Sequence, residues 1–379
     1  MRTKQIHLLF LFIFIALQSS AITAYKGTLD LSAHSRQLNR LTPLDGEWAV
    51  YWNKLYTPQD LAHDSLLKNT EYTCILNPWK NLQPFSNQSH GFGVATYRLK
   101  IIMPKKVSEN LVISLPQVFS SYKLYLNGSI LYESGTIATT KSGYSPEWTR
   151  QIQSIELRPG ENEIVLQVAN FDHHYGGVFS PIVLGSPEAL GSAKNLSLGS
   201  TLFFAGKLLI CAFLAFGLFW YNRKDKGLIY LSISMLLLAL HLACTYDFHI
   251  RSLIPSLSWA VLIRLPVSSL IATLLTYLLF TKHFLRIKPR INVLTNIVTG
   301  IGSVMLLSVF LPTSWFTMLS PYYYLVILIS FLAVGIPHLR IARWNTRMVW
   351  YTTVGSIALF VMVLLKALYQ NGFTIYPVF

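Results

Sequence analysis

A run of polar residues near the middle of the chain, Asn170-Phe171-Asp172-His173-His174, groups side chains that are well suited to binding. Imidazole and carboxylate groups are metal ligands, but successive residues of an extended chain point to opposite faces, so His173 and His174 cannot readily share one ion. No third ligand follows at a suitable spacing, and we therefore predict no metal and no cofactor. Asn170, Asp172 and His173 are instead candidates for ligand binding, and the alternative is a polar turn after a strand.

Aromatic side chains in loop-like stretches, near turn residues, could complete such a site. Exposed aromatic faces stack on ligands such as sugars, and aromatic residues commonly line small-molecule sites. The candidates are Trp79, Tyr144, Trp148 and Tyr175. The alternative for each of them is that it caps the core of its domain.

The acidic residues of the same region do not predict hydrolysis. A glycosidase needs two opposed carboxylates that flank the scissile bond. Glu47, Glu133, Glu147 and Asp172 are available, but nothing in their spacing pairs them. The chain also contains no GxGxxG, Walker, HExxH or GxSxG motif, so we predict that it is not an enzyme.

All these candidates lie in residues 25–195, where strand-like runs alternate with turn signals and long helical periodicity is absent. Asn127-Gly128 separates two strand patterns, and this pair predicts a hairpin because a type I′ turn needs positive φ at both central residues. The region is therefore expected to be an all-β sandwich.

Composition indicates a membrane protein. Of the 379 residues, 52% are hydrophobic and only 12% are charged, and the net charge is +15. Much of the positive charge lies in short loops between apolar segments, which argues against a nucleic-acid partner. The chain has three cysteines and no CxxC motif, so burial rather than a disulfide framework must stabilise the β region.

Residues 1–24 are predicted to be a signal peptide. Met1–Lys4 is basic, Leu8–Leu17 is apolar but too short to span a membrane, and small residues near Ala21 offer a cleavage site. The alternative is an uncleaved anchor helix. In both cases the region that follows is exported.

Six apolar segments follow the β region, and each is long enough to approach or exceed the roughly 20 residues that span a bilayer core. Their predicted bounds are 198–221, 228–246, 259–281, 291–311, 321–338 and 348–369. Lys and Arg gather after the first, third and fifth segments, with Arg251 as the clear exception on the opposite side. The positive-inside rule then places residues 25–195 and an external tail, 370–379, outside the cytoplasm.

Four ionisable residues fall in the outer half of these spans: Lys207, His241, Arg264 and Lys366. Such groups are costly in a membrane and are candidates for function. We predict that they form an electropositive pocket that binds an anionic group or couples ligand binding to the helices. The alternative is that Arg264 and Lys366 extend to lipid headgroups, while Lys207 pairs locally.

Four motifs occur in a familiar order: Ala95–Leu99, Leu111–Pro116, Tyr125–Gly128 and Pro159–Ile164. They resemble the jelly-roll, galactose-binding-like domains that accompany glycosidases. Together with the membrane spans, residues 40–370 resemble the bacterial seven-transmembrane receptors with diverse intracellular signalling modules. That resemblance implies an external sensor of a small molecule, such as a carbohydrate, in the bacterial inner membrane with its N-terminal domain in the periplasm.

The family pattern continues with a seventh helix and a cytoplasmic output module, neither of which this sequence contains. We therefore expect either a truncated receptor or one that signals through a cytoplasmic partner. The expected function is ligand reception that biases the packing of the helices. A membrane enzyme or transporter for sugar or lipid is one alternative, and a membrane-anchored carbohydrate-adhesive module is another.

Overall fold

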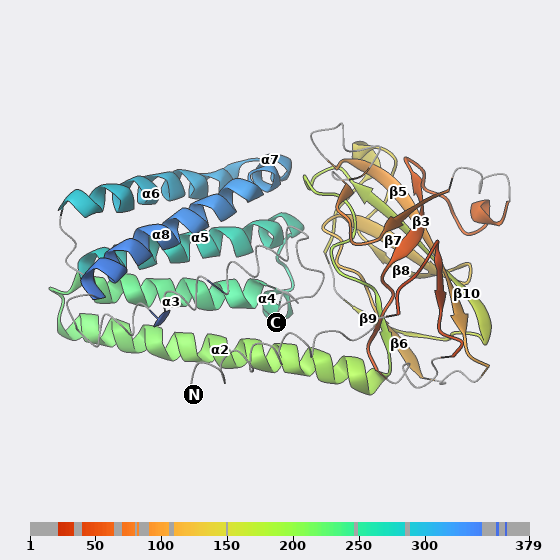
Figure 1. Ribbon diagram of the computed structural model, residues 1–379, viewed down its shortest axis with the longest axis horizontal. Helices are drawn as coiled ribbons and strands as arrows, with labels where there is room; N and C mark the ends of the chain where they lie inside the picture. Colours follow the sequence, from red (N-terminus) through yellow and green to blue (C-terminus); the bar gives the residue numbers. More distant parts are fainter. Residues whose placement is uncertain are drawn as a thin grey trace, which may run out of the picture.

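The computed structural model describes residues 22–33, 40–63, 70–79, 82, 91–105, 110–148, 151–245, 249–284, 289–342, 354–355 and 361. A β-sandwich lies against one end of a bundle of long helices (Figure 1). The prediction of an all-β domain followed by apolar helices is confirmed. Most of the predicted signal peptide, most of the span 348–369 with Lys366, and the tail 370–379 lie outside the described residues.

The larger sheet of the sandwich has seven strands in the order β4-β3-β5-β10-β7-β8, with β1 paired in parallel to β5. Its strands are β1 (Thr28–Asp30), β3 (Glu47–Trp52), β4 (Glu71–Cys74), β5 (Gly93–Met103), β7 (Ser121–Leu126), β8 (Ser129–Ser134) and β10 (Gly160–Asn170). Asn127 and Gly128 both have positive φ between β7 and β8, as the predicted hairpin requires. Two short 3-10 helices, η2 (Asp60–Ala62) and η5 (Lys141–Gly143), lie in the connections.

The smaller sheet has four antiparallel strands in the order β2-β11-β6-β9. They are β2 (Thr42–Pro43), β6 (Leu111–Ser114), β9 (Ile152–Ile155) and β11 (Val183–Gly185). Alternate residues of both sheets point inward, so that Leu99 and Leu166 of one sheet and Ile113 and Leu184 of the other belong to a single buried cluster.

The helical part contains α2 (Pro187–Tyr221), α3 (Lys226–Cys244), α4 (His249–Leu253), α5 (Trp259–Phe284), α6 (Pro289–Leu307), η6 (Ser308–Phe310), α7 (Thr313–Met318) and α8 (Ser320–Ala342). Among the described residues, α2, α3 and α5 are long and apolar enough to cross a membrane. Shorter apolar helical stretches occupy Thr295–Phe310 and Ser320–Ala333. The short connection between the predicted fourth and fifth spans contains the helix α7.

Helix α2 begins directly where the sandwich ends. Ser186 follows the last residue of β11, and its hydroxyl accepts a hydrogen bond of 3.2 Å from the Ala189 N–H as an N-cap. Pro187 occupies the first helical position, where its missing N–H costs nothing. The 35 residues of α2 extend about 52 Å at 1.5 Å per residue, well beyond the roughly 30 Å of a bilayer core. The first turns of α2 lie beside the sandwich, and the rest of the helix runs along the bundle (Figure 1).

Candidate functional site

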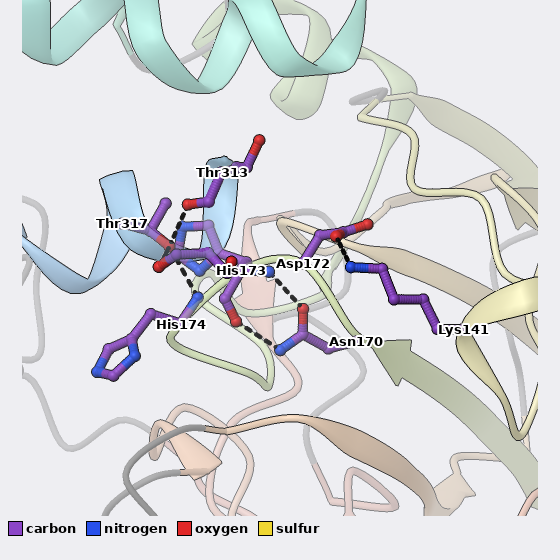
Figure 2. A network of polar contacts seen from close by, with 8 residues as sticks. Lys141, Asn170, Asp172, His173, His174, Thr313 and Thr317 are labelled. Atoms are coloured by element: carbon purple, nitrogen blue, oxygen red, sulfur yellow. Dashed lines mark hydrogen bonds and ion pairs between the residues drawn. The ribbon is translucent and has the colours of Figure 1, made fainter. Parts of the chain in front are cut away.

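The loop that follows β10, residues 171–179, which we call the seam loop, lies where the sandwich meets the bundle. Asn170 fixes its start, because the buried amide Nδ2 donates 2.7 Å hydrogen bonds to the carbonyl oxygens of Gly91 and His173. Its Oδ1 accepts a 3.0 Å hydrogen bond from the His173 N–H (Figure 2). One side chain thus closes the turn on itself and ties it to the segment just before β5.

His173 occupies an aromatic environment inside this loop. Its ring stacks on Phe119 with centroids 4.9 Å apart and contacts Phe179 edge-on at 5.9 Å. Its Nδ1 lies 2.8 Å from the Tyr175 carbonyl oxygen and 3.3 Å from the Tyr175 backbone nitrogen, so the backbone of Tyr175 holds the ring in place. The pKa of His173 is lowered to about 4, mainly by burial; the contact with the Tyr175 backbone opposes this shift, and the nearby His174 adds a smaller lowering effect.

The predicted aromatic residues surround the same loop. Trp79 is fully buried, and its indole N–H donates to the Tyr97 hydroxyl at 2.5 Å while its backbone N–H donates to Gly176 at 3.0 Å. Trp148 is buried edge-on against Phe119 with ring centroids 4.7 Å apart. Their burial is what the core-capping alternative predicts for these two residues.

Tyr144 and Asp172 complete the set on the other side of the loop. Tyr144 is buried against Phe171 at 5.3 Å, and Asp172 forms an ion pair of 2.8 Å with Lys141. Tyr175 is partly exposed. The structure therefore gathers all seven predicted ligand-binding residues around the seam loop, and their role in binding stays a prediction.

The seam loop also touches the bundle directly. The His174 N–H donates a 2.8 Å hydrogen bond to Thr317 Oγ1 of α7, and that hydroxyl donates to the Thr313 carbonyl at 2.9 Å (Figure 2). The Ser320 hydroxyl at the start of α8 donates to the Tyr175 hydroxyl at 3.3 Å. A displacement of the seam loop would therefore change its contacts with α7 and α8, because backbone as well as side-chain atoms form these contacts.

An ion pair forms a second contact between the two parts. Arg251 of α4 donates to the Glu147 carboxylate at 2.6 Å and also to the Trp148 carbonyl oxygen. The sequence alone does not predict this pairing, although Arg251 is the exception to the positive-inside pattern. Its charge contacts the sandwich, and this contact gives a basic residue a role at that position.

Apolar packing fills the space between these polar contacts. Trp148 belongs to one buried cluster with Leu262 of α5, Phe316 of α7 and Tyr323 of α8. A residue of the sandwich thus forms part of the core of the bundle. We call the whole contact, from the seam loop to the Arg251–Glu147 pair, the seam.

Three of the four predicted intramembrane residues, Lys207, His241 and Arg264, lie among the described residues, and each contacts different partners. Lys207 is exposed on α2, with its ammonium 3.9 Å from the centroid of Phe203 one turn nearer the sandwich. His241 is buried, and its Nδ1 lies 2.8 Å from the Pro266 carbonyl oxygen of α5. Arg264 donates to the carbonyl oxygens of Ala260 and Leu311, and Lys366 lies outside the described residues.

Among the described residues, no group of three or more His, Cys, Asp or Glu side chains could hold a metal ion. The contacts of the seam are hydrogen bonds, packed rings and the ion pairs Asp172–Lys141 and Glu147–Arg251, all of them noncovalent contacts suited to binding.

Acid is expected to weaken this region through His173. A pKa of about 4 in the folded state, against 6.5 in the unfolded chain, means that the unfolded state binds more protons between these values. The contribution of neutral His173 to the free energy of unfolding is therefore fully present above pH 6.5. It falls as the pH decreases towards 4, by up to about 3 kcal/mol. Thermal unfolding of the full chain at pH 4 to 7 measures this loss.

His173→Gln should remove that part of the pH dependence while lowering stability at pH 7. His63→Gln, which changes an exposed histidine, should keep it. A pH dependence that is the same in all three proteins would contradict a buried neutral His173.

The fold and the seam together define a membrane protein with several spanning helices and a β-sandwich docked on one end of them. Residues 198–379 match the family described as 7TM diverse intracellular signalling. This half of the chain therefore belongs to that receptor family. No curated protein matches the chain.

Similar solved structures are bacterial glycosidases. The Faecalibacterium prausnitzii beta-glucuronidase has 17% identity and a TM-score of 0.31, over 39% of this chain and 31% of the enzyme. A Bifidobacterium dentium beta-glucuronidase complexed with coumarin-3-O-glucuronide has 15% identity and a TM-score of 0.30, over 38% and 29%. An Eisenbergiella tayi GH2 beta-galacturonidase bound to galacturonate has 13% identity and a TM-score of 0.27, over 39% and 25%. The chain spans less than a third of the length of each enzyme.

Proposed function

We propose that the protein is a receptor whose sandwich, a galactose-binding-like jelly roll, binds a small molecule and transmits binding to the helices. One observation carries the proposal: the loop around which the candidate binding residues gather is the loop that contacts α7 through His174 and Thr317. A ligand that prefers one position of this loop would have different affinities for two arrangements of the helices, as a conformational signal requires.

A second connection supports transmission. Strand β11 is a central strand of the smaller sheet, and α2 continues from it through the Ser186 cap without an intervening loop. A shift of the smaller sheet would therefore move α2, the helix that continues from β11. The two connections together allow the sandwich to act on α2 and on α7 and α8.

The orientation is part of the proposal. Arg223, Lys224 and Lys226 lie in the turn at the end of α2 that is remote from the sandwich, and Lys282 lies in the last turn of α5. The positive-inside rule puts these residues in the cytoplasm and the sandwich in the periplasm of a bacterial inner membrane. The basic turns would then face a cytoplasmic signalling partner.

A ligand screen on the full chain in lipid nanodiscs tests the function. We would measure thermal unfolding and hydrogen exchange with neutral sugars, sugar acids and small anions as probes. A true ligand should raise the unfolding temperature with concentration and should change amide exchange in both residues 170–179 and α7. Binding that changes exchange in the sandwich alone would instead support an anchored adhesive module.

Breaking the seam ion pair should separate binding from transmission. Glu147→Gln removes the charge that Arg251 contacts, so the probe that binds the wild type should still bind but should change exchange in α4 and α7 much less. The matched control is Glu161→Gln, which breaks the 2.6 Å Lys100–Glu161 pair at the opposite end of β10. Equal transmission in both variants would exclude the ion pair from the path.

A further inference from the structure

An apolar groove opens on the surface of the bundle beside α6. It has a volume of about 300 Å³, and its lining residues are Val304, Met305, Leu307, Ser308, Leu311 and Leu319. Val304 and Leu307 are 68% and 63% exposed, so this groove opens on the surface that lipid would cover. It runs from the last turn of α6 along η6 to Leu311 and to Leu319 at the end of α7.

A cation without an acidic partner lies at the head of this groove. Arg264 Nη2 donates at 2.9 Å to the carbonyl oxygen of Leu311, a groove residue, and Nη1 donates at 2.8 Å to Ala260. Its Nε is buried and has no hydrogen-bond partner, and in the described part of the chain no carboxylate pairs with the guanidinium. A charge held this way at the edge of a membrane favours an anion beside it.

Exposed aromatic residues adjoin, in the sequence, the residues that Arg264 contacts. Phe310 and Trp315, which are 84% and 59% exposed, directly precede Leu311 and Phe316, and Tyr322, near the start of α8, is 55% exposed. Exposed Trp and Tyr side chains of membrane proteins gather where lipid headgroups meet the hydrocarbon core. Arg264 is thus at headgroup level, and the groove extends from it into the hydrocarbon region.

We propose that this surface binds one phospholipid of the sandwich-side leaflet, with its phosphate on Arg264 and an acyl chain in the groove. Guanidinium groups bind phosphate by charge-assisted hydrogen bonds, and an acyl chain matches the apolar lining. Phe316 and Leu319 link the site to the seam, because Phe316 packs beside the Arg264 guanidinium and both residues pack with Trp148's cluster. The site is separate from ligand reception and does not depend on it.

Native mass spectrometry of the full chain, delipidated in detergent and titrated with phosphatidylglycerol, tests the site. The wild type should retain one phospholipid, and Arg264→Gln should weaken retention by roughly tenfold or more, the effect of losing a hydrogen bond to a charged group. Arg264→Lys should restore part of it. Leu307→Trp, which fills the groove from an exposed position, should also weaken it.

Lys207→Gln is the matched control, because Lys207 is an exposed cation of α2 outside the groove. It should retain the lipid as the wild type does. Equal retention by wild type, Arg264→Gln and Leu307→Trp would show only bulk lipid and would overturn the proposal. Loss with Arg264→Gln but not with Leu307→Trp would show a phosphate site without a seated chain, and it would overturn the proposal as stated.

Discussion

Inserting one alanine after Asn195 in α2 is expected to break the seam. Asn195 is exposed in the part of α2 between the sandwich and the membrane, so the insertion adds a residue without disturbing a buried contact. One added residue turns the helix by about 100° and lengthens it by about 1.5 Å. The sandwich can no longer keep both β11 on α2 and the His174–Thr317 contact in place.

Hydrogen exchange gives the measurement. The His174 amide is bonded to Thr317 Oγ1 in the native chain. Its exchange should accelerate by roughly tenfold or more once that contact is lost, since each 1.4 kcal/mol of opening free energy is worth a factor of ten. The Glu147–Arg251 pair should be lost in the same variant.

A four-residue insertion at the same place is the control. It turns the helix by about 400°, which restores the original direction to within about 40° while adding about 6 Å of length. Protection of His174 should therefore recover in part. If both insertions leave His174 as protected as in the wild type, α2 does not set the position of the sandwich.

Local patterns in the sequence predicted the elements well because each depends on near neighbours. The Asn127-Gly128 pair predicted the hairpin from backbone conformation alone, and continuous apolar stretches predicted α3 and α5. The predicted membrane span begins at Leu198, where continuous apolar character begins, whereas the helix that contains it begins at Pro187. The signal that marks its true start is the cap, Ser186 followed by Pro187 and Glu188.

The seam could not be predicted in the same way, because its contacts join residues that are far apart in the chain. Glu147 and Arg251 are separated by 104 positions, and His174 and Thr317 by 143. Spacing and periodicity carry no information on such pairs. The signal in the sequence is Arg251, a basic residue in a loop on the side of the predicted membrane where the loops otherwise have almost no Lys or Arg. Lys207 and Arg264, in contrast, are both predicted to lie in the outer half of their spans. They lie on different helices, α2 and α5, and contact different partners.

Gly176→Ala is expected to have the largest effect on stability of any single substitution in the seam loop. A Cβ at this position would lie 2.3 Å from the Gly91 carbonyl oxygen and 2.4 Å from Trp79 Cε3. The carbonyl belongs to the backbone, and Trp79 is fully buried and hydrogen-bonded to Tyr97. Neither group can therefore move aside without a loss of stability. Forcing such overlap into a packed core costs about 3 kcal/mol or more.

Thermal unfolding of the full chain measures the cost, and hydrogen exchange locates it. The loss of protection should begin in residues 170–179 and extend to α7, because the loop that moves away from Trp79 carries His174 with it. Gly191→Ala is the matched control, since Gly191 is helical and a Cβ there meets nothing within 4 Å. That substitution should stabilise α2 by about 0.5–1 kcal/mol. Equal stability of the two variants would mean that the seam loop does not approach Trp79 as closely as described. It would then contradict the packing that joins the candidate binding residues to the helices.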